Sequence, residues 1–338
     1  MSSIETISQQ RRRWPLIAMV SGLFTVGFGL AVLVRTYDID SVQRAWAIGR
    51  SFFEDYRITI EFGEDRFGEA SLRSVRGVVP TANTFDVNLE LVANFKPSSR
   101  FRVMSQSVGR VDLLVEFDER EPSTGLTDRK RKIEACSGVV ISPTLVMTAD
   151  HCTRTLDKRD YRIEGAKIRL GYLRDGTDEG FALNLTPTKI PCSATYDCAF
   201  FEIEPGQPRA AELKPARLTG ARPTSGQDLV VIHHPLGGTM HVTRRGCRVK
   251  PAKAGASDVA GSSFLHECGT LPGTSGAPIF DECTGDVVAL HVRGDRSLVA
   301  MAQNDGQGIA LADIAYANET LMRLLQPAAI CTQAEDER

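Results

Sequence analysis

The sequence lacks the features that indicate a metal, cofactor or nucleic acid partner. Its 40 lysines and arginines are balanced by 42 aspartates and glutamates, and the formal net charge is −2. No basic surface for nucleic acid is therefore expected. Even the nearest cysteines, Cys192 and Cys198, are spaced too widely for the usual zinc motif. We expect no metal, no cofactor and no nucleic acid.

Charged residues are also missing from the 21 residues Trp14–Val34. At a rise of about 1.5 Å per residue, a helix of this length crosses a hydrocarbon layer of roughly 30 Å. Three arginines directly precede the stretch and only one follows it closely. The positive-inside rule therefore places residues 1–13 in the cytoplasm and exports the remainder. The length of the run, 14–34, favours a retained transmembrane anchor over a cleaved signal peptide.

No cysteine precedes the apolar stretch, and all eight lie on its exported side. This placement is typical of disulfide-bonded proteins in an oxidising compartment. We therefore expect a periplasmic or extracellular domain that one N-terminal helix anchors in the membrane. The cysteines stand at positions 136, 152, 192, 198, 247, 268, 283 and 331.

Residues 35–105 are a candidate membrane-proximal region with helix and strand character. Apolar residues between 42 and 56 recur at near-helical spacing, which indicates an amphipathic helix. Alternating apolar residues from 57 to about 100 indicate strands and turns. No catalytic motif occurs here, so the region is a candidate site for a protein partner.

Residues 106–338 are rich in predicted short strands. Val111, Leu113 and Val115 alternate with polar residues, as in a half-buried strand. Further apolar runs separated by glycine and proline turns continue to about residue 311, which is typical of antiparallel barrels or sandwiches. Residues 311–325 contain many helix formers and neither glycine nor proline. They predict a closing C-terminal helix.

The segment Cys136–Cys152 carries the first catalytic motif. It ends in Thr-Ala-Asp-His-Cys, which places His151 where a predicted strand ends. The segment resembles the trypsin-like (chymotrypsin-fold) serine proteases, whose base histidine lies in a Thr-Ala-x-His-Cys motif. In that family a disulfide from the preceding strand often holds the motif in place. The resemblance implies that His151 is a general base and that Cys136 pairs with Cys152.

A base histidine also needs a buried carboxylate that fixes its tautomer. In the trypsin-like family this group belongs to a downstream aspartate that opens a hydrophobic strand. Asp197 precedes the run Cys-Ala-Phe-Phe-Glu-Ile and matches that position. Asp160, Asp175 and Asp178 are alternatives, but each lies among polar residues.

The third motif, Gly-Thr-Ser-Gly-Ala-Pro, begins at Gly273. It resembles the family signature Gly-x-Ser-Gly-x-Pro, which implies that Ser275 is the nucleophile. By the same resemblance the N–H groups of Gly273 and Ser275 form the oxyanion hole. The order His, Asp, Ser differs from that in α/β-hydrolases and subtilisins. The resemblance covers about residues 106–325 and implies an all-β fold of two packed six-stranded antiparallel β-barrels.

Two positions depart from the trypsin pattern. Many family members have an aspartate directly before the nucleophile, which pairs with a new N-terminal amine after activation cleavage. Here that position is Thr274, so the usual zymogen switch is expected to be absent or replaced. Gly269 stands where trypsin has the aspartate that selects Lys and Arg, so strong basic specificity is not expected.

The sequence also resembles the bacterial branch that contains glutamyl endopeptidases. In that branch a threonine and a histidine line the primary pocket, and Thr270 and His291 occupy those places. Arg293 lies two residues further along the strand, and Gly294 completes the predicted substrate-binding set. These polar groups suit an acidic or amide side chain, so we hypothesise a preference for Glu or Gln before the scissile bond. The alternative is that His291 is only a strand residue with a local hydrogen bond.

The remaining cysteines and histidines carry weaker predictions. Resemblance to bacterial relatives implies a Cys247–Cys268 disulfide beside the nucleophile loop, and elimination leaves two further pairs whose connectivity the sequence cannot establish. Solvated histidines are expected at the turn that begins at His233 and His234. The further pairs are Cys192–Cys198 and Cys283–Cys331, and the other histidines with weak cases are His241 and His266.

The sequence therefore predicts a membrane-anchored, extracytoplasmic serine endopeptidase. An alternative hypothesis is a catalytically silent protease-fold scaffold at the membrane. It arises because Asp150 and Thr274 depart from the family pattern near the active site and could leave the oxyanion loop unformed. A third is an esterase or acyltransferase with the same nucleophile, which turnover of simple esters rather than peptides would distinguish.

Overall fold

A computed structural model describes most of the chain beyond residue 87. All described residues belong to one compact unit, Ser51–Arg338. The predicted cytoplasmic segment, membrane span and amphipathic helix lie outside them, and no helix among them is long and apolar enough to cross a membrane. The described residues are 58–60, 88–120, 125–154, 159–174, 180–190, 192, 196–251, 263–294 and 306–331.

The first sheet contains a closed barrel. Its strands follow the order β1-β4-β3-β6-β7-β8-β5, and a further pairing of β4 with β5 closes six of them. Every pair is antiparallel. One of the two expected six-stranded barrels is thus confirmed. The strands are β1 (Ile58–Ile60), β3 (Val108–Arg120), β4 (Thr127–Ser142), β5 (Leu145–Thr148), β6 (Arg159–Leu170), β7 (Phe181–Pro187) and β8 (Ala199–Ile203).

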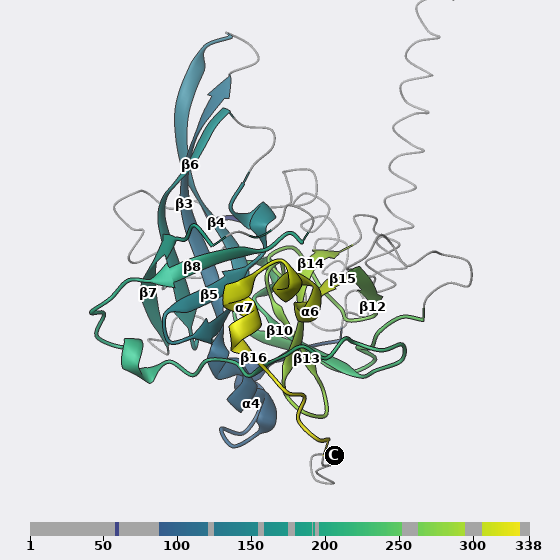
Figure 1. Cartoon of the computed structure of the whole chain (residues 1–338). Coiled ribbons are helices and arrows are strands. Elements are labelled where there is room, and N and C mark those ends of the chain that lie inside the picture. The colour runs from purple at the N-terminus through teal and green to yellow at the C-terminus, as the bar shows by residue number, and fades with distance from the viewer. Residues whose placement is uncertain are drawn as a thin grey trace, which may run out of the picture. The chain divides into compact units, whose positions relative to one another are not determined.

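The apolar positions predicted in β3 are buried, but the strand is not half-buried as expected, because Asp112 and Glu116 are each only 2% exposed. Val111, Leu113 and Val115 are at most 1% exposed and contribute to the core of the barrel. β3 pairs with β4 along its whole length and with β6 on its other side. In Figure 1 these three strands run side by side as a long ribbon.

The second sheet is a half-barrel, which corrects the expectation of a second six-stranded barrel. Among the described residues, no regular ladder joins the edge strand β12 back to β10. Two single-residue bridges occur there instead, one between Arg248 and Asp228 and one between Val249 and His266. The strands are β2 (Leu89–Leu91), β9 (Leu218–Thr219), β10 (Leu229–His233), β11 (His241–Thr243), β12 (Ser263–His266), β13 (Pro278–Asp281), β14 (Val287–Gly294), β15 (Gly306–Ala310) and β16 (Leu325–Gln326).

One continuous hydrophobic cluster joins the two sheets. It contains Val139 and Phe200 from the first sheet and Ile232, Phe280 and Leu290 from the second, each no more than 3% exposed. Because burial of apolar side chains is the main favourable term in folding, this cluster holds the two sheets together. The turn that contains Ser275, called the nucleophile turn below, and the turn that contains His151 meet at this junction.

Two short helices follow the last long strand, where the sequence predicted one helix. They are α6 (Leu311–Tyr316) and α7 (Glu319–Leu324). Asn318 separates them, because its side chain accepts a hydrogen bond from Leu321 N–H and caps α7. A third short helix, α4 (Arg100–Met104), precedes the barrel.

Two strands come from the predicted membrane-proximal region. β1 pairs with β4 of the barrel, and β2 pairs with β11 of the half-barrel. Each is three residues long. The described parts of this region therefore add a strand to both sheets.

Candidate active site

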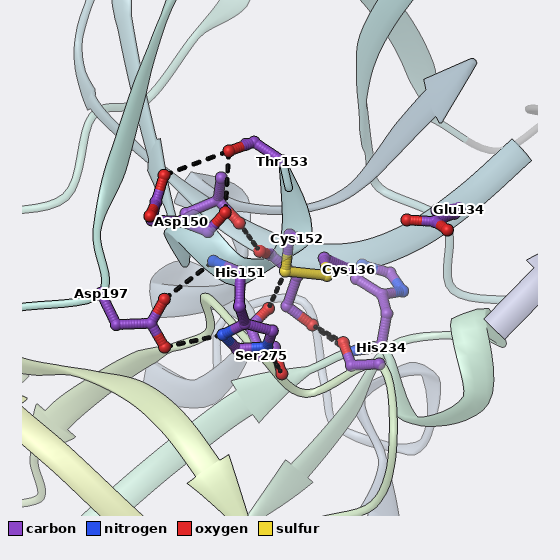
Figure 2. Close-up of a disulfide and its surroundings, with 12 residues drawn as sticks. Glu134, Cys136, Asp150, His151, Cys152, Thr153, Asp197, His234 and Ser275 are labelled. Atoms are coloured by element: carbon purple, nitrogen blue, oxygen red, sulfur yellow. Dashed lines mark hydrogen bonds and ion pairs between the residues drawn. A yellow bond between two sulfur atoms is a disulfide. The ribbon is translucent and has the colours of Figure 1, made fainter. Parts of the chain in front are cut away.

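His151 lies in a turn that directly follows β5. The strand ends at Thr148, and one 3₁₀ turn spans Asp150–Cys152. A disulfide joins Cys152 to Cys136 on the neighbouring strand β4, so the turn is fixed covalently to the barrel. Figure 2 shows this disulfide beside the histidine.

Asp197 contacts the same turn from the segment before β8. One carboxylate oxygen accepts a hydrogen bond from the backbone N–H of His151 at 2.8 Å, and the other lies 2.7 Å from its Nδ1. The backbone carbonyl of Asp197 accepts a third bond from Asp150 N–H. Asp197 has φ of 44°, a left-handed conformation that aspartate tolerates better than most residues. Three contacts therefore orient the carboxylate toward the imidazole.

Ser275 approaches the other side of the imidazole from the half-barrel. Its Oγ lies 2.7 Å from Nε2 of His151, and Figure 2 shows the line from Asp197 through His151 to Ser275. A carboxylate beside Nδ1 keeps the proton of a neutral imidazole on that nitrogen. Nε2 then carries the lone pair that accepts the serine proton. The structure thus brings the three predicted residues together in hydrogen-bond contact.

The turn before Ser275 presents two backbone donors. Gly273 has φ of 89°, which glycine adopts without strain. Within the described residues, neither Gly273 N–H nor Ser275 N–H donates a hydrogen bond to another protein group. Paired backbone donors of this kind stabilise an oxyanion as it develops on a substrate carbonyl.

Ser137, which no sequence motif marks, links the barrel to the nucleophile turn. Its hydroxyl donates to the carbonyl of Gly273 at 2.8 Å and accepts from His234 N–H at 2.9 Å. Its backbone N–H donates to the carbonyl of Ser275 at 2.9 Å. These contacts cross from one sheet to the other, so no local pattern in the sequence reveals them.

The four predicted substrate-binding residues lie in two segments. Thr270 is half-buried just before the nucleophile turn. His291 lies in β14, where its backbone carbonyl accepts from Gly276 N–H at 2.8 Å. A bulge follows His291, and Arg293 is exposed whereas His291 is buried. Gly294 ends the strand.

The expectation of solvated histidines is wrong for this protein. His233, His234 and His266 are 0% exposed and His241 is 5% exposed. Each ring has a hydrogen-bond partner, which stabilises it in the interior. Burial lowers the pKa of His234 and of His266 to about 3. These rings are therefore neutral near pH 7.

His291 and His266 form a buried pair. Nδ1 of His291 lies 3.0 Å from Nε2 of His266. Burial, followed by the neighbouring rings of His266, His233 and His151, holds the pKa of His291 well below its usual range. The pair is thus uncharged at neutral pH.

All four expected disulfides are present. Besides Cys136–Cys152, they include the Cys247–Cys268 bridge that closes the segment before the nucleophile turn. No group of metal-ligating side chains suited to a metal ion occurs within the described ranges. The remaining bridges are Cys192–Cys198 and Cys283–Cys331.

Part of the sequence matches a known protein family. Residues 136–290 match the family described as trypsin-like peptidase domain. No curated protein matches the sequence. A solved HtrA-type protease, a variant of AlgW with a decapeptide, is 14% identical, with a TM-score of 0.50 over 67% of this chain and 67% of that chain. This likeness shows the fold.

Two further solved structures are similar. The active form of the Rv3671c protease from M. tuberculosis is 19% identical, with a TM-score of 0.44 over 68% of this chain and 86% of that chain. A Glu endopeptidase in complex with MPD is 15% identical, with a TM-score of 0.46 over 70% and 94% of the two chains. The matched peptidase domain contains His151, Asp197 and Ser275, and the protein is a serine endopeptidase.

Proposed function

We propose that the chain is a membrane-anchored, extracytoplasmic endopeptidase in which Ser275 attacks the peptide carbonyl. The observation that carries this proposal is the unbroken line of hydrogen bonds from Asp197 to His151 and on to Ser275, each 2.7 Å long. A nucleophile in contact with a base, and a base in contact with an orienting carboxylate, is the arrangement that activates a serine hydroxyl.

The reaction follows from the proton positions. Nε2 of His151 takes the proton as Ser275 Oγ bonds to the carbonyl carbon, and Asp197 stabilises the imidazolium that forms. The N–H groups of Gly273 and Ser275 bind the oxyanion. His151 then gives its proton to the leaving amine, and an acyl-enzyme remains. Water, activated by the same imidazole, releases the acid product.

The proposed preference for Glu or Gln rests on the proton positions of the buried histidine pair. Nδ1 of His266 accepts from Cys268 N–H at 3.2 Å, so neutral His266 carries its proton on Nε2. That proton is donated to Nδ1 of His291, and neutral His291 therefore keeps its own proton on Nε2. No hydrogen bond to this Nε2 occurs among the described residues. It is a donor suited to a carboxylate or amide oxygen.

Thr270 supplies a hydroxyl to the same proposed pocket. Arg293 is exposed, so we place it with Gly294 at the rim, where its charge adds long-range attraction for an acidic residue. Because solvent screens an exposed charge, the imidazole donor is the main determinant in this proposal.

Hydrolysis of a peptide library by the purified full-length protein in detergent tests both claims. We expect cleavage that is enriched for Glu or Gln before the scissile bond and absent in a Ser275→Ala variant. Cleavage without that enrichment would reject the preference alone. Turnover of simple esters without peptide cleavage would instead favour an esterase, and a well-folded protein without any turnover would favour a scaffold.

The proposed anchor is tested separately. Residues 14–34 are an uncharged run long enough to cross a bilayer, with arginines on the N-terminal side. We expect the full chain to stay in the membrane fraction after high-salt and alkaline washing. Protease added outside intact cells or spheroplasts should degrade a C-terminal tag. Release of the full-length chain by the washes would reject the anchor.

A further inference from the structure

A chain of buried hydrogen bonds lies behind the nucleophile turn, outside the Ser275–His151–Asp197 line. It contains the side chains of His233, Thr243 and Thr274, each 0% exposed. The hydroxyl of Thr274 lies 2.7 Å from Nδ1 of His233, and the hydroxyl of Thr243 lies 3.2 Å from Nε2 of the same ring. One imidazole therefore bridges two threonines.

The two ends of this chain determine the direction of every bond. At one end, the Thr243 hydroxyl donates to the carbonyl of Gly269 at 2.9 Å. Thr243 then accepts the proton on Nε2 of His233, which leaves Nδ1 as an acceptor. The Thr274 hydroxyl donates to Nδ1 and accepts from Leu271 N–H at 3.2 Å. Each polar group in the chain is satisfied by the neutral Nε2–H tautomer of His233.

This chain of hydrogen bonds holds the nucleophile turn at three points. The carbonyl of Gly269, the N–H of Leu271 and the side chain of Thr274 all belong to the seven residues that end at Ser275. In addition, Thr274 N–H donates to the Leu271 carbonyl at 3.0 Å. The same seven residues present both proposed oxyanion donors. His233 lies in β10 and Thr243 in β11, two paired strands of the half-barrel, so the turn is tied to a rigid part of the fold.

We propose that His233 is a positioning residue that holds the oxyanion turn in its working conformation through the hydroxyl of Thr274. This inference rests on the proposed function. In many trypsin-like proteases the residue at this position is an aspartate that needs a newly formed N-terminal amine. The Thr274 hydroxyl and the His233 imidazole are both present before any cleavage. Their hydrogen bond can therefore form without a new N-terminal amine. The turn is thus formed without activation cleavage.

The ionisation state of His233 agrees with this role. Burial lowers its pKa well below the usual range, and the nearby rings of His241 and His234 act in the same direction. His241 is its partner across the β10–β11 pair. His291 also lies within electrostatic range. All four rings face an interior where a proton is disfavoured, so Nδ1 of His233 remains an acceptor near pH 7.

Phosphonylation kinetics of the full-length protein in detergent, measured with a fluorophosphonate probe, test the proposal. The test variant is Thr274→Val, which keeps the side-chain shape and removes the hydroxyl. We expect the limiting rate of phosphonylation to fall at least about tenfold, because a displaced oxyanion donor weakens transition-state binding. The probe concentration that gives half the limiting rate should change less than about threefold. Thr274→Ser, which retains the hydroxyl, should restore the rate.

Thr219→Val is the matched control. Thr219 is also buried, and its hydroxyl also accepts a backbone N–H, that of Ala221, but it lies in β9. This variant should keep the wild-type rate. His233→Leu should show the loss seen in Thr274→Val, and the double variant should be no slower than either single variant, because both remove one interaction.

Several outcomes would overturn the proposal. They are a folded Thr274→Val protein with the wild-type limiting rate, an equal loss in Thr219→Val, and additive losses in the double variant. Should Thr274→Val fail to fold, His233→Leu carries the same test, and a wild-type rate in that variant overturns the proposal. Failure of the proposed function is distinguishable, because it would leave the wild-type protein itself unlabelled, and the positioning role would then fall with it.

Discussion

In the barrel the buried polar side chains are largely charged, whereas in the half-barrel they are largely neutral imidazoles and hydroxyls. Arg110 and Asp112 form a buried ion pair in β3, with side chains 0% and 2% exposed. Across the active site, His233 and Thr274 form a buried bond between neutral groups. The Arg110–Asp112 pair in the barrel is therefore held by charge, whereas the His233–Thr274 pair in the half-barrel is held by a hydrogen bond between neutral groups.

The difference shows how each half of the active site is held. His151 is fixed by the Cys136–Cys152 disulfide and by the carboxylate of Asp197. Ser275 lies in a turn that is supported by the hydrogen bonds of the neutral His233 ring and its two threonine partners. A neutral network keeps its geometry only while its imidazoles stay unprotonated, so the two halves should respond differently to charge removal and to acid.

The largest effect is expected from the charge on the barrel side of the site. Asp197→Asn keeps the size of the side chain but removes the charge that stabilises the His151 imidazolium. We expect kcat for a cleaved peptide to fall about 10⁴-fold, which is about 5 kcal/mol of transition-state stabilisation. The urea midpoint should stay close to that of the wild type. A fall of less than about tenfold would mean that the charge of Asp197 contributes little to the stabilisation of the imidazolium.

The next largest effect concerns the buried ion pair. Asp112→Ala leaves the guanidinium of Arg110 in the interior without its carboxylate partner, which should cost about 3–5 kcal/mol of the free energy of unfolding. Glu212→Ala is the matched control, because Glu212 pairs with Arg209 at 2.7 Å on the surface. Its urea midpoint should not change measurably. Equal midpoints for both variants would remove the contrast between the buried charges of the barrel and ordinary surface pairs.

Acid should selectively destabilise the half-barrel. His234 and His266 have pKa values of about 3 in the folded protein, lowered chiefly by burial, whereas an unfolded histidine titrates near about 6.5. The unfolded state therefore binds more protons as the pH falls from about 6.5 toward 3, and stability is lost over that range. We expect a loss of about 1.4 kcal/mol per pH unit for each of these histidines below about pH 6.

Urea unfolding between pH 7 and pH 5 measures this effect, because most carboxylates do not titrate there. Replacement of His266 by Gln should make the urea midpoint less dependent on pH, because it removes one histidine's contribution of about 1.4 kcal/mol per pH unit. A midpoint that is independent of pH across this range would show that these rings are not held neutral.

A smaller effect is expected where the two sheets meet. Gly276 has φ of 80°, and a β-carbon there would lie 2.2 Å from Oγ1 of Thr148 and 2.4 Å from the carbonyl of Ser137. Gly276→Ala should cost about 2–3 kcal/mol of the free energy of unfolding through strain and crowding. Gly285→Ala is the control, since its φ of 72° is similar but its nearest contacts are 3.8 Å away.

The difference between the two alanine variants isolates the crowding between the sheets from the backbone strain that they share. Equal urea midpoints would mean that the junction can open by the width of a methyl group, and would weaken the claim that both halves are rigidly joined.

The sequence predicted the site residues that belong to short, recognisable motifs. His151, Asp197 and Ser275 each follow a recognisable local pattern, and the structure places them in contact. The cysteine pairs also follow from resemblance and elimination, and all are present. The three catalytic motifs can be recognised locally because turns and strand ends depend mainly on nearby residues, whereas a pair such as Cys283–Cys331 joins segments 48 residues apart.

Other features depend on contacts between distant segments, and the sequence did not reveal them. The turn at His233 and His234 has the composition of an exposed loop, yet both rings are buried, and distant residues such as Tyr172 and Thr274 contact them. Ser137 acts across the junction of the two sheets. The incomplete closure of the second sheet depends on single-residue bridges at Val249, which no periodic pattern encodes.

The central claim is that Ser275 is an activated nucleophile. The most direct test is the intact mass of the full-length protein in detergent after exposure to a fluorophosphonate probe, beside its Ser275→Ala variant. We expect one probe group per wild-type chain, mapped to Ser275, and none on the variant. A well-folded wild-type protein that stays unlabelled, or a probe group that persists on Ser275→Ala, would contradict it.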